Sequence, residues 1–353
     1  MSITRRDFLL GAAAAGAGSL ACSHQTARLA APRNEVLSGD DFAFVHLTDM
    51  HVTTRRRGGE GWLACAESVR ALPDKPAFAL MGGDMAFDGM YTPKPDFEEQ
   101  IRLFKAGSDA LGIPWYPCMG NHDVLGWSSR RKVSLDEPDL GKKMIMDRLE
   151  WERPYYSFDY HGWHFAVLDC IFPVQTADGP SYEARIGPEQ LEWLGADLGS
   201  AGDRPKVVMT HIAAFCAINQ INGNAKANAI GHMVVSDTKE LRHVLERHKV
   251  KALLQGHSHD IQEFCYNGVW YLTSASASAA WWSGTWHGFD YGYTVFHCQG
   301  DTLRWAHKTF EWESHLDPAD DLERRKTAER EAFLEEQRRL LERDRAAGQQ
   351  LVS

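Results

Sequence analysis

Residues 42–51 read FAFVHLTDMH and contain the pattern that decides the fold. The mostly apolar run at 42–47 is typical of a buried strand, and Asp49 and His51 follow it at once. The same order, an apolar run and then polar side chains, recurs along the chain. The further runs occupy residues 77–81, 115–119, 165–168, 206–209 and 251–254. Helical patterns lie between them, which predicts an α/β fold with functional side chains on the loops at the carboxyl ends of strands.

The helical patterns span residues 61–72, 96–111, 135–149, 188–198 and 236–249. The last is the clearest, because Asp237 and Glu240 have capping-box spacing and apolar residues then recur on one face. After residue 259 the pattern changes to strand-like segments at 261–266, 269–273, 291–297 and 302–309. Asn267-Gly268 between two of them predicts a type I′ hairpin turn, because this pair readily adopts positive φ.

The polar clusters contain residue types that bind divalent transition metals. The candidate ligands are Asp49, His51, Asp84, Asn121, His211, His257 and His259. In Asp49-Met-His51 an extended backbone would point the first and third side chains toward one ion, and His257 and His259 repeat that spacing. Asp84 is the candidate bridge, because one carboxylate can be shared by two cations. This mixture of oxygen and nitrogen ligands predicts two divalent transition-metal ions, Fe, Mn or Zn.

The clusters also predict a reaction. A lone buried histidine is more often a core residue than a ligand, but here histidines recur at strand ends together with Asp, Asn and Gly. Two adjacent cations lower the pKa of a water between them, which predicts hydrolysis of phosphoesters by a metal-bridging hydroxide. The departing oxygen then needs a proton, and His122 is the candidate general acid. Asp88 or Asp123 either orients His122 or only caps its loop.

The chain resembles the calcineurin-like metallophosphoesterase superfamily over residues 42–300, through the ordered motifs Asp49-x-His51, Gly83-Asp84, Gly120-Asn-His-Asp123, His211 and Gly256-His-x-His259. This resemblance implies a sandwich of two mixed β-sheets flanked by helices. It assigns one metal to Asp49, His51, Asp84 and His259, and the other to Asp84, Asn121, His211 and His257. Phe87 stands where purple acid phosphatases carry a tyrosine. The pattern is closest to bacterial cyclic-nucleotide and glycerophosphodiester phosphodiesterases.

The predicted function is therefore dinuclear-metal-dependent hydrolysis of a small phosphoester, with a phosphodiesterase favoured. A phosphomonoesterase and a non-catalytic metal-binding protein of the same fold are the alternatives. The formal net charge of −10 predicts no nucleic-acid surface. The sequence leaves the substrate open. Residues 219–228 would arch over the metals, and residues 281–286 either form an aromatic platform beside them or cover a sheet edge. Residues 55–57, three arginines, either attract phosphate or are only solvated.

The N-terminus predicts export. Arg5 and Arg6 precede a short Ala/Gly-rich apolar run, and residues 1–21 resemble a signal for the twin-arginine (Tat) export machinery. The run is too short for a stable transmembrane span, so we expect cleavage and a periplasmic or extracellular protein. Lipidation at Cys22 is the second choice. We expect a linker at 22–41, the metallophosphoesterase domain at 42–316 and a charged helix or tail at 317–353. The sequence leaves the oligomeric state open.

Overall fold

The computed structural model describes residues 41–221 and 232–317, together with residues 27–28 and the positions 320, 329, 332, 333, 335, 336 and 339. The predicted Tat signal, nearly all of the linker, most of the amide-rich stretch at 219–228 and most of the charged tail lie outside the described residues. No helix within the described ranges is both long and apolar enough to cross a membrane.

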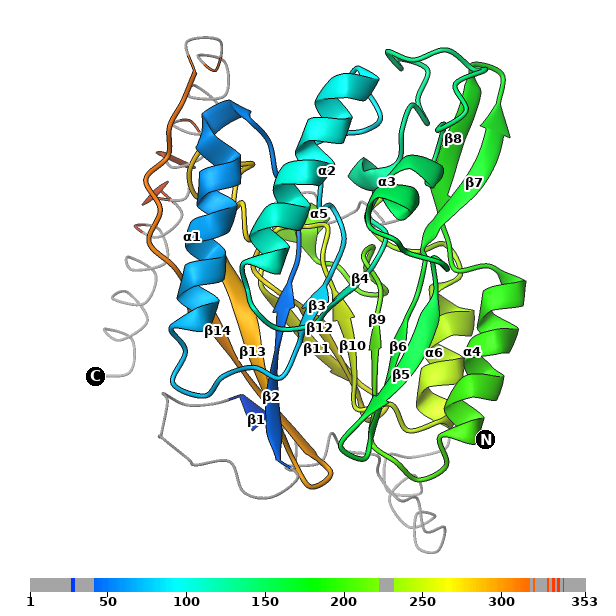
Figure 1. Cartoon of the computed structure of the whole chain (residues 1–353). Coiled ribbons are helices and arrows are strands. Elements are labelled where there is room, and N and C mark those ends of the chain that lie inside the picture. The colour runs from blue at the N-terminus through cyan, green and yellow to red at the C-terminus, as the bar shows by residue number, and fades with distance from the viewer. Residues whose placement is uncertain are drawn as a thin grey trace, which may run out of the picture.

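Two mixed sheets pack face to face as a sandwich (Figure 1). The first sheet has the order β1 (Ala27–Arg28), β14 (Thr302–Thr309), β13 (Gly292–Gln299), β2 (Phe42–Leu47), β3 (Ala79–Met81) and β4 (Trp115–Pro117). The second has the order β11 (Gln262–Tyr266), β12 (Val269–Thr273), β10 (Ala252–Gln255), β9 (Lys206–Met209), β6 (Trp163–Val167) and β5 (Tyr156–Tyr160). This arrangement confirms the predicted fold.

Helices cover the outer face of each sheet. The helices α1 (Gly58–Arg70) and α2 (Lys94–Asp109) lie over the first sheet, and α4 (Pro188–Ser200) and α6 (Thr238–Arg247) lie over the second (Figure 1). The shorter elements are α3 (Lys143–Arg148), α5 (Ile218–Ile221) and the 3-10 turns η1 (Arg55–Arg57) and η2 (Asn121–Asp123). A separate hairpin of β7 (Ile171–Thr176) and β8 (Gly179–Ala184) stands at one end.

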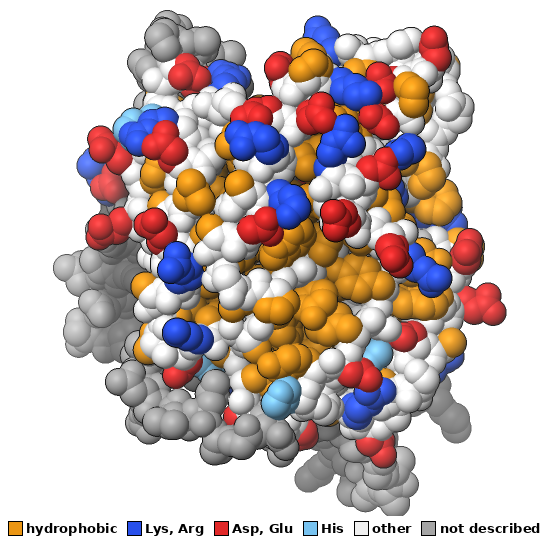
Figure 2. All heavy atoms as spheres, in the orientation of Figure 1, with side chains coloured by type: hydrophobic (Ala, Val, Ile, Leu, Met, Phe, Trp, Pro, Cys, Tyr) orange, Lys and Arg blue, Asp and Glu red, His pale blue; other side chains and the backbone are white. Residues whose placement is uncertain are grey.

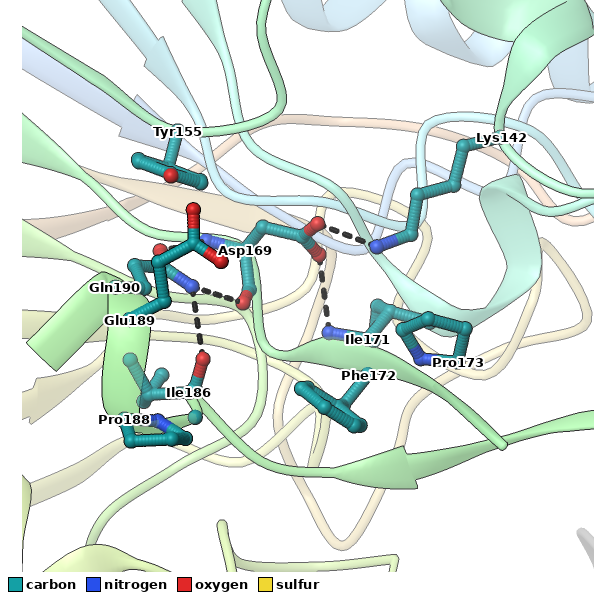
Figure 3. A pocket seen from close by; sticks show the side chains of 11 residues that line it. Lys142, Tyr155, Asp169, Ile171, Phe172, Pro173, Ile186, Pro188, Glu189 and Gln190 are labelled. Carbon is teal, nitrogen blue, oxygen red and sulfur yellow. Dashed lines mark hydrogen bonds and ion pairs between the residues drawn. The ribbon is translucent and has the colours of Figure 1, made fainter.

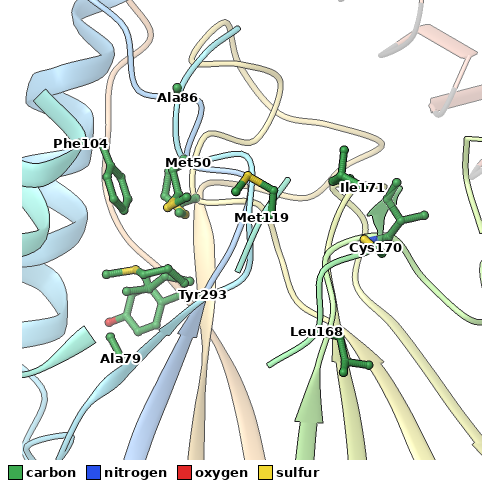
Figure 4. Packing of buried hydrophobic residues seen from close by; sticks show 14 of the residues in the cluster. Met50, Ala79, Ala86, Phe104, Met119, Leu168, Cys170, Ile171 and Tyr293 are labelled. Carbon is green, nitrogen blue, oxygen red and sulfur yellow. The ribbon is translucent and has the colours of Figure 1, made fainter. Parts of the chain in front are cut away.

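The strands build two cores because successive side chains point to opposite faces. Phe44 of β2 faces the second sheet, where its ring meets Phe165 of β6 edge-on at 5.4 Å. Leu47 of the same strand joins the core under the helices. The core under the helices continues beyond the ends of the strands. Figure 4 shows Met50 and Met119 of this core packed among the loops. The loops that carry the predicted ligands therefore rest on packed apolar side chains.

The edge strands β4 and β5 meet on one side of the sandwich. The rings of Tyr116 and Phe158 stack at 3.9 Å, and the Tyr156 hydroxyl donates to the carbonyl of Pro117 at 2.9 Å. Hydrophobic side chains gather below α2 on the face drawn in Figure 2. Pro117 suits an edge strand because proline has no N–H to donate to a neighbour.

Two sequence predictions are wrong in detail. The helix predicted over 135–149 is confined to α3, because Pro138 and the left-handed Gly141, with φ 80°, interrupt its first half. The capping box of α6 does not form, since the Asp237 carboxylate accepts the backbone N–H groups of Ile186 at 3.0 Å and Gly187 at 2.8 Å instead. Asp237 thus joins α6 to the start of α4.

Two of the hairpins, β11–β12 and β7–β8, differ in whether the sequence predicts them. The turn between β11 and β12 is the predicted one, with φ 49° at Asn267 and 83° at Gly268. The hairpin of β7 and β8 is not predicted, because the residues of β7 are mostly exposed and show no clean alternation. Its position is therefore a result of tertiary packing.

Candidate metal centre

The candidate metal centre lies where several strands end. The strands β2 and β3 run parallel in the first sheet, and β9 and β10 run parallel in the second, so their carboxyl ends lie together. Backbone hydrogen bonds join the following loops. The Asp49 N–H donates to Gly83 O at 3.0 Å, and the Gly256 N–H donates to His211 O at 2.9 Å. Side chains from both sheets therefore meet in one place.

Asp49, His51 and His259 form the first group of candidate ligands. All three are buried, and their ligand atoms lie within 4.8 Å of one another. His51 Nε2 lies 3.1 Å from His259 Nε2, which lies 3.3 Å from Asp49 Oδ1. One carboxylate and two imidazoles that converge in this way are donors that Zn, Mn and Fe all accept.

Asp84, His211 and His257 form the second group, again within 4.8 Å. Asn121 lies beside it, because its neighbour Gly120 approaches Asp84 so closely that a Cβ there would lie 2.2 Å from Asp84 Oδ1. The Asn121 Oδ1 atom is buried and has no hydrogen-bond partner among the described residues. A buried amide oxygen without a partner is unfavourable, and a cation is a group that would satisfy it.

Asp84 lies between the two groups. Its Oδ2 atom is 3.5 Å from His51 Nε2 of the first group and 3.2 Å from His211 Nε2 of the second. Its Oδ1 atom accepts the backbone N–H of His122 at 2.8 Å, which fixes the orientation of the carboxylate. One oxygen therefore faces imidazoles of both groups, as a shared ligand must.

Backbone carbonyls orient three of the ligand imidazoles. In each pair the histidine Nδ1 atom lies near a backbone carbonyl oxygen: His51 lies 3.3 Å from Phe87 O, His211 lies 2.8 Å from Gly82 O and His259 lies 2.5 Å from Ala279 O. An imidazole that donates from Nδ1 to a carbonyl presents a lone pair at Nε2. Such carbonyl partners are the usual support of metal-binding histidines, because they fix both tautomer and ring orientation.

The charges of the site also suit cations. Burial lowers the pKa of His51 well below its usual value and that of His257 to about 4, so both imidazoles are neutral at pH 7. Neutral imidazole is the form that binds metals. Burial opposes the charged form of His211 too, but the charge and hydrogen bond of Asp84 together with the charge of Asp49 outweigh burial and raise the pKa of His211 to about 10. The buried carboxylate thus draws positive charge to this position.

The backbone is left-handed, not extended, at five of the seven candidate ligands. The prediction for Asp49-Met-His51 is therefore wrong, because φ is 53° at Asp49 and 41° at His51. The ligands Asp84, His257 and His259 share this conformation. A left-handed residue other than glycine costs about 1–2 kcal/mol, and such strain persists mainly at functional sites, where the surrounding structure holds it.

Residues 42–260 match the sequence family of calcineurin-like phosphoesterases. This chain belongs to that family. A probable cyclic nucleotide phosphodiesterase of Xenorhabdus bovienii is 21% identical over 250 residues, which are 68% of this chain and 88% of the relative. A probable glycerophosphodiester phosphodiesterase of Arcobacter nitrofigilis is 23% identical over 61% of this chain and 68% of its own length.

One further sequence relative is named as a phosphatase, and one solved structure resembles this chain in fold. Tartrate-resistant acid phosphatase type 5 of Homo sapiens is 25% identical over 52% of this chain, and this chain spans only 54% of that relative's length. A dimetal phosphatase structure from Danio rerio superposes with a TM-score of 0.54 at 13% identity, covering 76% of this chain and 99% of the other. That superposition supports the fold alone.

His122 of this metallophosphoesterase lies beside the first ligand group. Its ring is 4.9 Å from the ring of His51, and its Nδ1 atom is 3.6 Å from Asp88 Oδ1. The side chain is 22% exposed, so it is accessible to a substrate at the metals. Asp123 instead accepts two backbone N–H groups of the loop after β3, at 2.9 and 3.0 Å. Of the two carboxylates, Asp88 faces His122 and Asp123 caps the loop.

A pocket of about 300 Å³ lies between the hairpin and the start of α4 (Figure 3). Its polar groups bind one another: Lys142 pairs with the Asp169 carboxylate, and the Gln190 side chain bonds to the Asp169 backbone at 2.8 Å. Next to it, Cys170 Sγ accepts the N–H of Ile212 at 3.2 Å. The pair of Lys142 and Asp169 therefore fixes the segment that borders the His211 loop.

The three arginines at 55–57 do not offer free charge to phosphate. Arg56 is buried and makes a bidentate pair with Asp320, at 3.1 and 2.9 Å, and Arg55 pairs with the same carboxylate at 2.9 Å. Arg57 pairs with Glu60. Sequence reasoning misses Asp320 because 264 residues separate it from Arg56 and no local pattern marks it.

Proposed function

We propose that this phosphoesterase hydrolyses phosphodiesters of small molecules at a dinuclear metal centre. Seven side chains would hold the two ions, Fe, Mn or Zn: Asp49, His51, Asp84, Asn121, His211, His257 and His259. When bound, such cations supply Lewis-acid activation of water and of the phosphoryl oxygens. The observation that carries the proposal is the position of Asp84 Oδ2, 3.5 Å from His51 Nε2 and 3.2 Å from His211 Nε2.

The chain's own residues supply positioning and a proton. The carbonyls of Phe87, Gly82 and Ala279 hold ligand imidazoles in orientation. His122 donates a proton to the departing oxygen, because it is partly exposed beside the first group and faces the carboxylate of Asp88. Asp88 stabilises the cationic form of His122 by its charge.

The test uses the full chain, stripped of metal and reloaded with Mn. Bis(p-nitrophenyl) phosphate and p-nitrophenyl phosphate are compared at equal metal content, and we expect the diester to have the higher kcat/KM. Asp84→Ala should abolish hydrolysis and lower the bound metal measured by elemental analysis. Asp203→Ala is the matched control, because Asp203 is exposed before β9, at the end opposite the site. Full activity of Asp84→Ala would contradict the shared carboxylate.

A phosphomonoesterase is the second candidate, and the acid phosphatases among the relatives support it. A higher kcat/KM for p-nitrophenyl phosphate than for the diester would establish it in place of the diesterase. A protein that binds two metal ions but hydrolyses no phosphoester in a broad panel would be the non-catalytic form of the fold.

Export by the Tat machinery is proposed as well, on the strength of Arg5 and Arg6 before the apolar run. The Arg5→Lys, Arg6→Lys double variant should remain in the cytoplasm, while the unchanged chain should leave it. Cell fractionation with an activity assay measures this. Unimpaired export of the double variant would contradict Tat dependence.

A further inference from the structure

The loop after β12 is fixed to the first ligand loop by a buried tryptophan. Trp282 Nε1 lies 3.0 Å from both Met50 O and His51 O and donates to them. Its ring stacks on Tyr291 at 5.7 Å and is fully buried. Trp282 therefore belongs to the hydrophobic core, whereas Trp281 and Trp286 are not among the side chains of that core.

Trp281 and Trp286, named here the aromatic wall, lie against the first ligand group. The Trp281 ring is 4.4 Å from the ring of His259 and 5.5 Å from that of His51. The Trp286 ring is 5.1 Å from that of Trp281 at an angle of 87°, and its Nε1 donates to Ser258 O at 2.9 Å. Both side chains are only half-buried. Apolar ring surface is thus accessible next to the ligands.

The structure holds the aromatic wall in an unfavourable conformation. Trp281 has φ 51°, a left-handed backbone that bulky residues rarely adopt. The Arg56 guanidinium donates to Trp281 O at 2.7 Å, while Asp320 binds the other side of the same guanidinium. A buried ion pair thus holds the strained backbone of a residue whose side chain is half-exposed. Strain of this kind is a reason to look for a role in binding.

We propose that the aromatic wall binds a planar aromatic group of the substrate while its phosphoryl group occupies the metal centre, an inference that rests on the proposed function. Two indoles at nearly right angles offer one face and one edge to an inserted ring. Stacking on an aromatic side chain strengthens binding by roughly tenfold or more for each ring. The substrate is therefore an aryl or nucleoside phosphoester, not an ester of small polar alcohols.

The first test is binding, because it does not depend on turnover. Phenylphosphonate and methylphosphonate are titrated calorimetrically into the Mn-loaded full chain, and we expect the phenyl compound to bind about tenfold more tightly. Trp281→Leu with Trp286→Leu should remove the difference, and Trp281→Phe should retain most of it. Trp193→Leu is the matched control, since Trp193 packs on Tyr155 away from the metal ligands. Equal binding of both phosphonates to the unchanged chain would overturn the proposal.

The second test is turnover with one leaving group. Methyl p-nitrophenyl phosphate is compared with bis(p-nitrophenyl) phosphate and with the p-nitrophenyl ester of thymidine 5′-phosphate. We expect KM to be about tenfold lower, at similar kcat, for the two esters whose second ester group is also aromatic. Of the tryptophan variants, only the leucine variants of the aromatic wall should lose this difference in KM. The ester with the lowest KM distinguishes an aryl from a nucleoside group. The same KM for all three esters, unchanged in the leucine variants, would overturn the inference and leave the proposed hydrolysis intact.

Failure of the proposed hydrolysis can be distinguished from failure of the aromatic-wall proposal. If the Mn-loaded chain hydrolyses none of the three esters but binds phenylphosphonate more tightly than methylphosphonate, the proposed hydrolysis fails and the aromatic wall stands. If the leucine double variant unfolds, the Trp286→Leu single variant, in which Trp281 keeps its contacts with His259 and Arg56, provides the same comparison. A preference for the phenyl compound that survives both Trp286→Leu and Trp281→Leu, each made alone, would overturn the proposal.

Discussion

Among single residues, His122 has the most specific predicted role. Burial lowers its pKa, but the charges of Asp84 and Asp88 outweigh burial and raise the pKa above the usual value for histidine. A raised pKa favours the protonated imidazole, which is the form that a general acid needs. The neighbouring Asn121 and Asp123 serve other purposes, since one presents a buried amide oxygen and the other caps a loop.

His122→Ala should lower kcat by about 10²- to 10³-fold for substrates with an alkoxide leaving group. The loss should be much smaller for bis(p-nitrophenyl) phosphate, because p-nitrophenolate departs readily without a proton. Cyclic AMP, whose leaving group is a sugar alkoxide, provides the comparison. Metal content measured in parallel should be unchanged. Equal losses on both substrates would contradict the general-acid role.

Asp88→Asn should shift the pH dependence of hydrolysis. A general acid acts in its protonated form, so activity falls as pH rises through the pKa of His122. Removing the charge of Asp88 lowers that pKa, and the alkaline fall should therefore begin at lower pH. Profiles of kcat against pH measure the shift. Asp96→Asn, an exposed change in α2, should leave the profile in place, and an unmoved profile for Asp88→Asn would exclude its charge as the cause.

At the scale of elements, the ends of β6 and α3 are joined by an ion pair. Lys142 precedes α3 and pairs with Asp169 after β6, and both side chains are largely buried. Burial raises the pKa of Asp169, although Lys142 opposes that rise. Removal of the lysine would leave a buried carboxylate without a counter-charge, which is unfavourable in a region of low dielectric constant.

Lys142→Met should therefore lower the free energy of unfolding by about 3 kcal/mol at pH 7. The loss should be smaller at pH 5, because Asp169 without its partner takes up a proton more readily there. Urea unfolding at both pH values measures this. Lys143→Met is the matched control, since Lys143 is exposed and pairs only with exposed Asp147 and, at 3.9 Å, with Asp139, so that it should change stability by less than about 0.5 kcal/mol. Equal effects of the two substitutions would contradict the argument.

At the scale of the whole molecule, the C-terminal segment reaches the catalytic end of the sandwich. Asp320 is buried and binds Arg56 in the loop after β2, and Arg56 in turn holds the carbonyl of Trp281. One contact chain thus joins the end of the domain, the first ligand loop and the aromatic wall. The described positions between 329 and 339 are helical and exposed.

Asp320→Asn should lower the free energy of unfolding by about 2 kcal/mol, because the charge-assisted bonds to buried Arg56 are weakened. It should also raise KM for aromatic esters more than for methyl p-nitrophenyl phosphate, since the aromatic wall loses its support. Thermal unfolding and the three-ester comparison measure both effects. Asp317→Asn, in an exposed pair with Arg55 at 3.5 Å, is the control and should change little. If Asp320→Asn lowers stability but leaves the ratios of KM among the three esters unchanged, Asp320 has only a structural role.

Much of the fold could be predicted because its signals are local. The apolar run at 42–47 and the Asn267-Gly268 turn are each specified by adjacent residues, and both form as predicted. The helix over 135–149 fails for a local reason as well, because Pro138 lies within it. The hairpin of β7 and β8 could not be predicted, since its strands are only partly buried and lack the alternation that marks one buried face.

Short segments of sequence specify which side chains follow the strands, and therefore the chemistry of the candidate ligands, because ligand type and strand-end position are local properties. The position of Asp84 between His51 and His211 and the contact of Trp281 with His259 arise only from the packing of the folded chain. These contacts join residues far apart in the chain, and they depend on how two sheets pack. Left-handed backbone at the ligands is likewise imposed by that packing, since isolated residues of these types disfavour it.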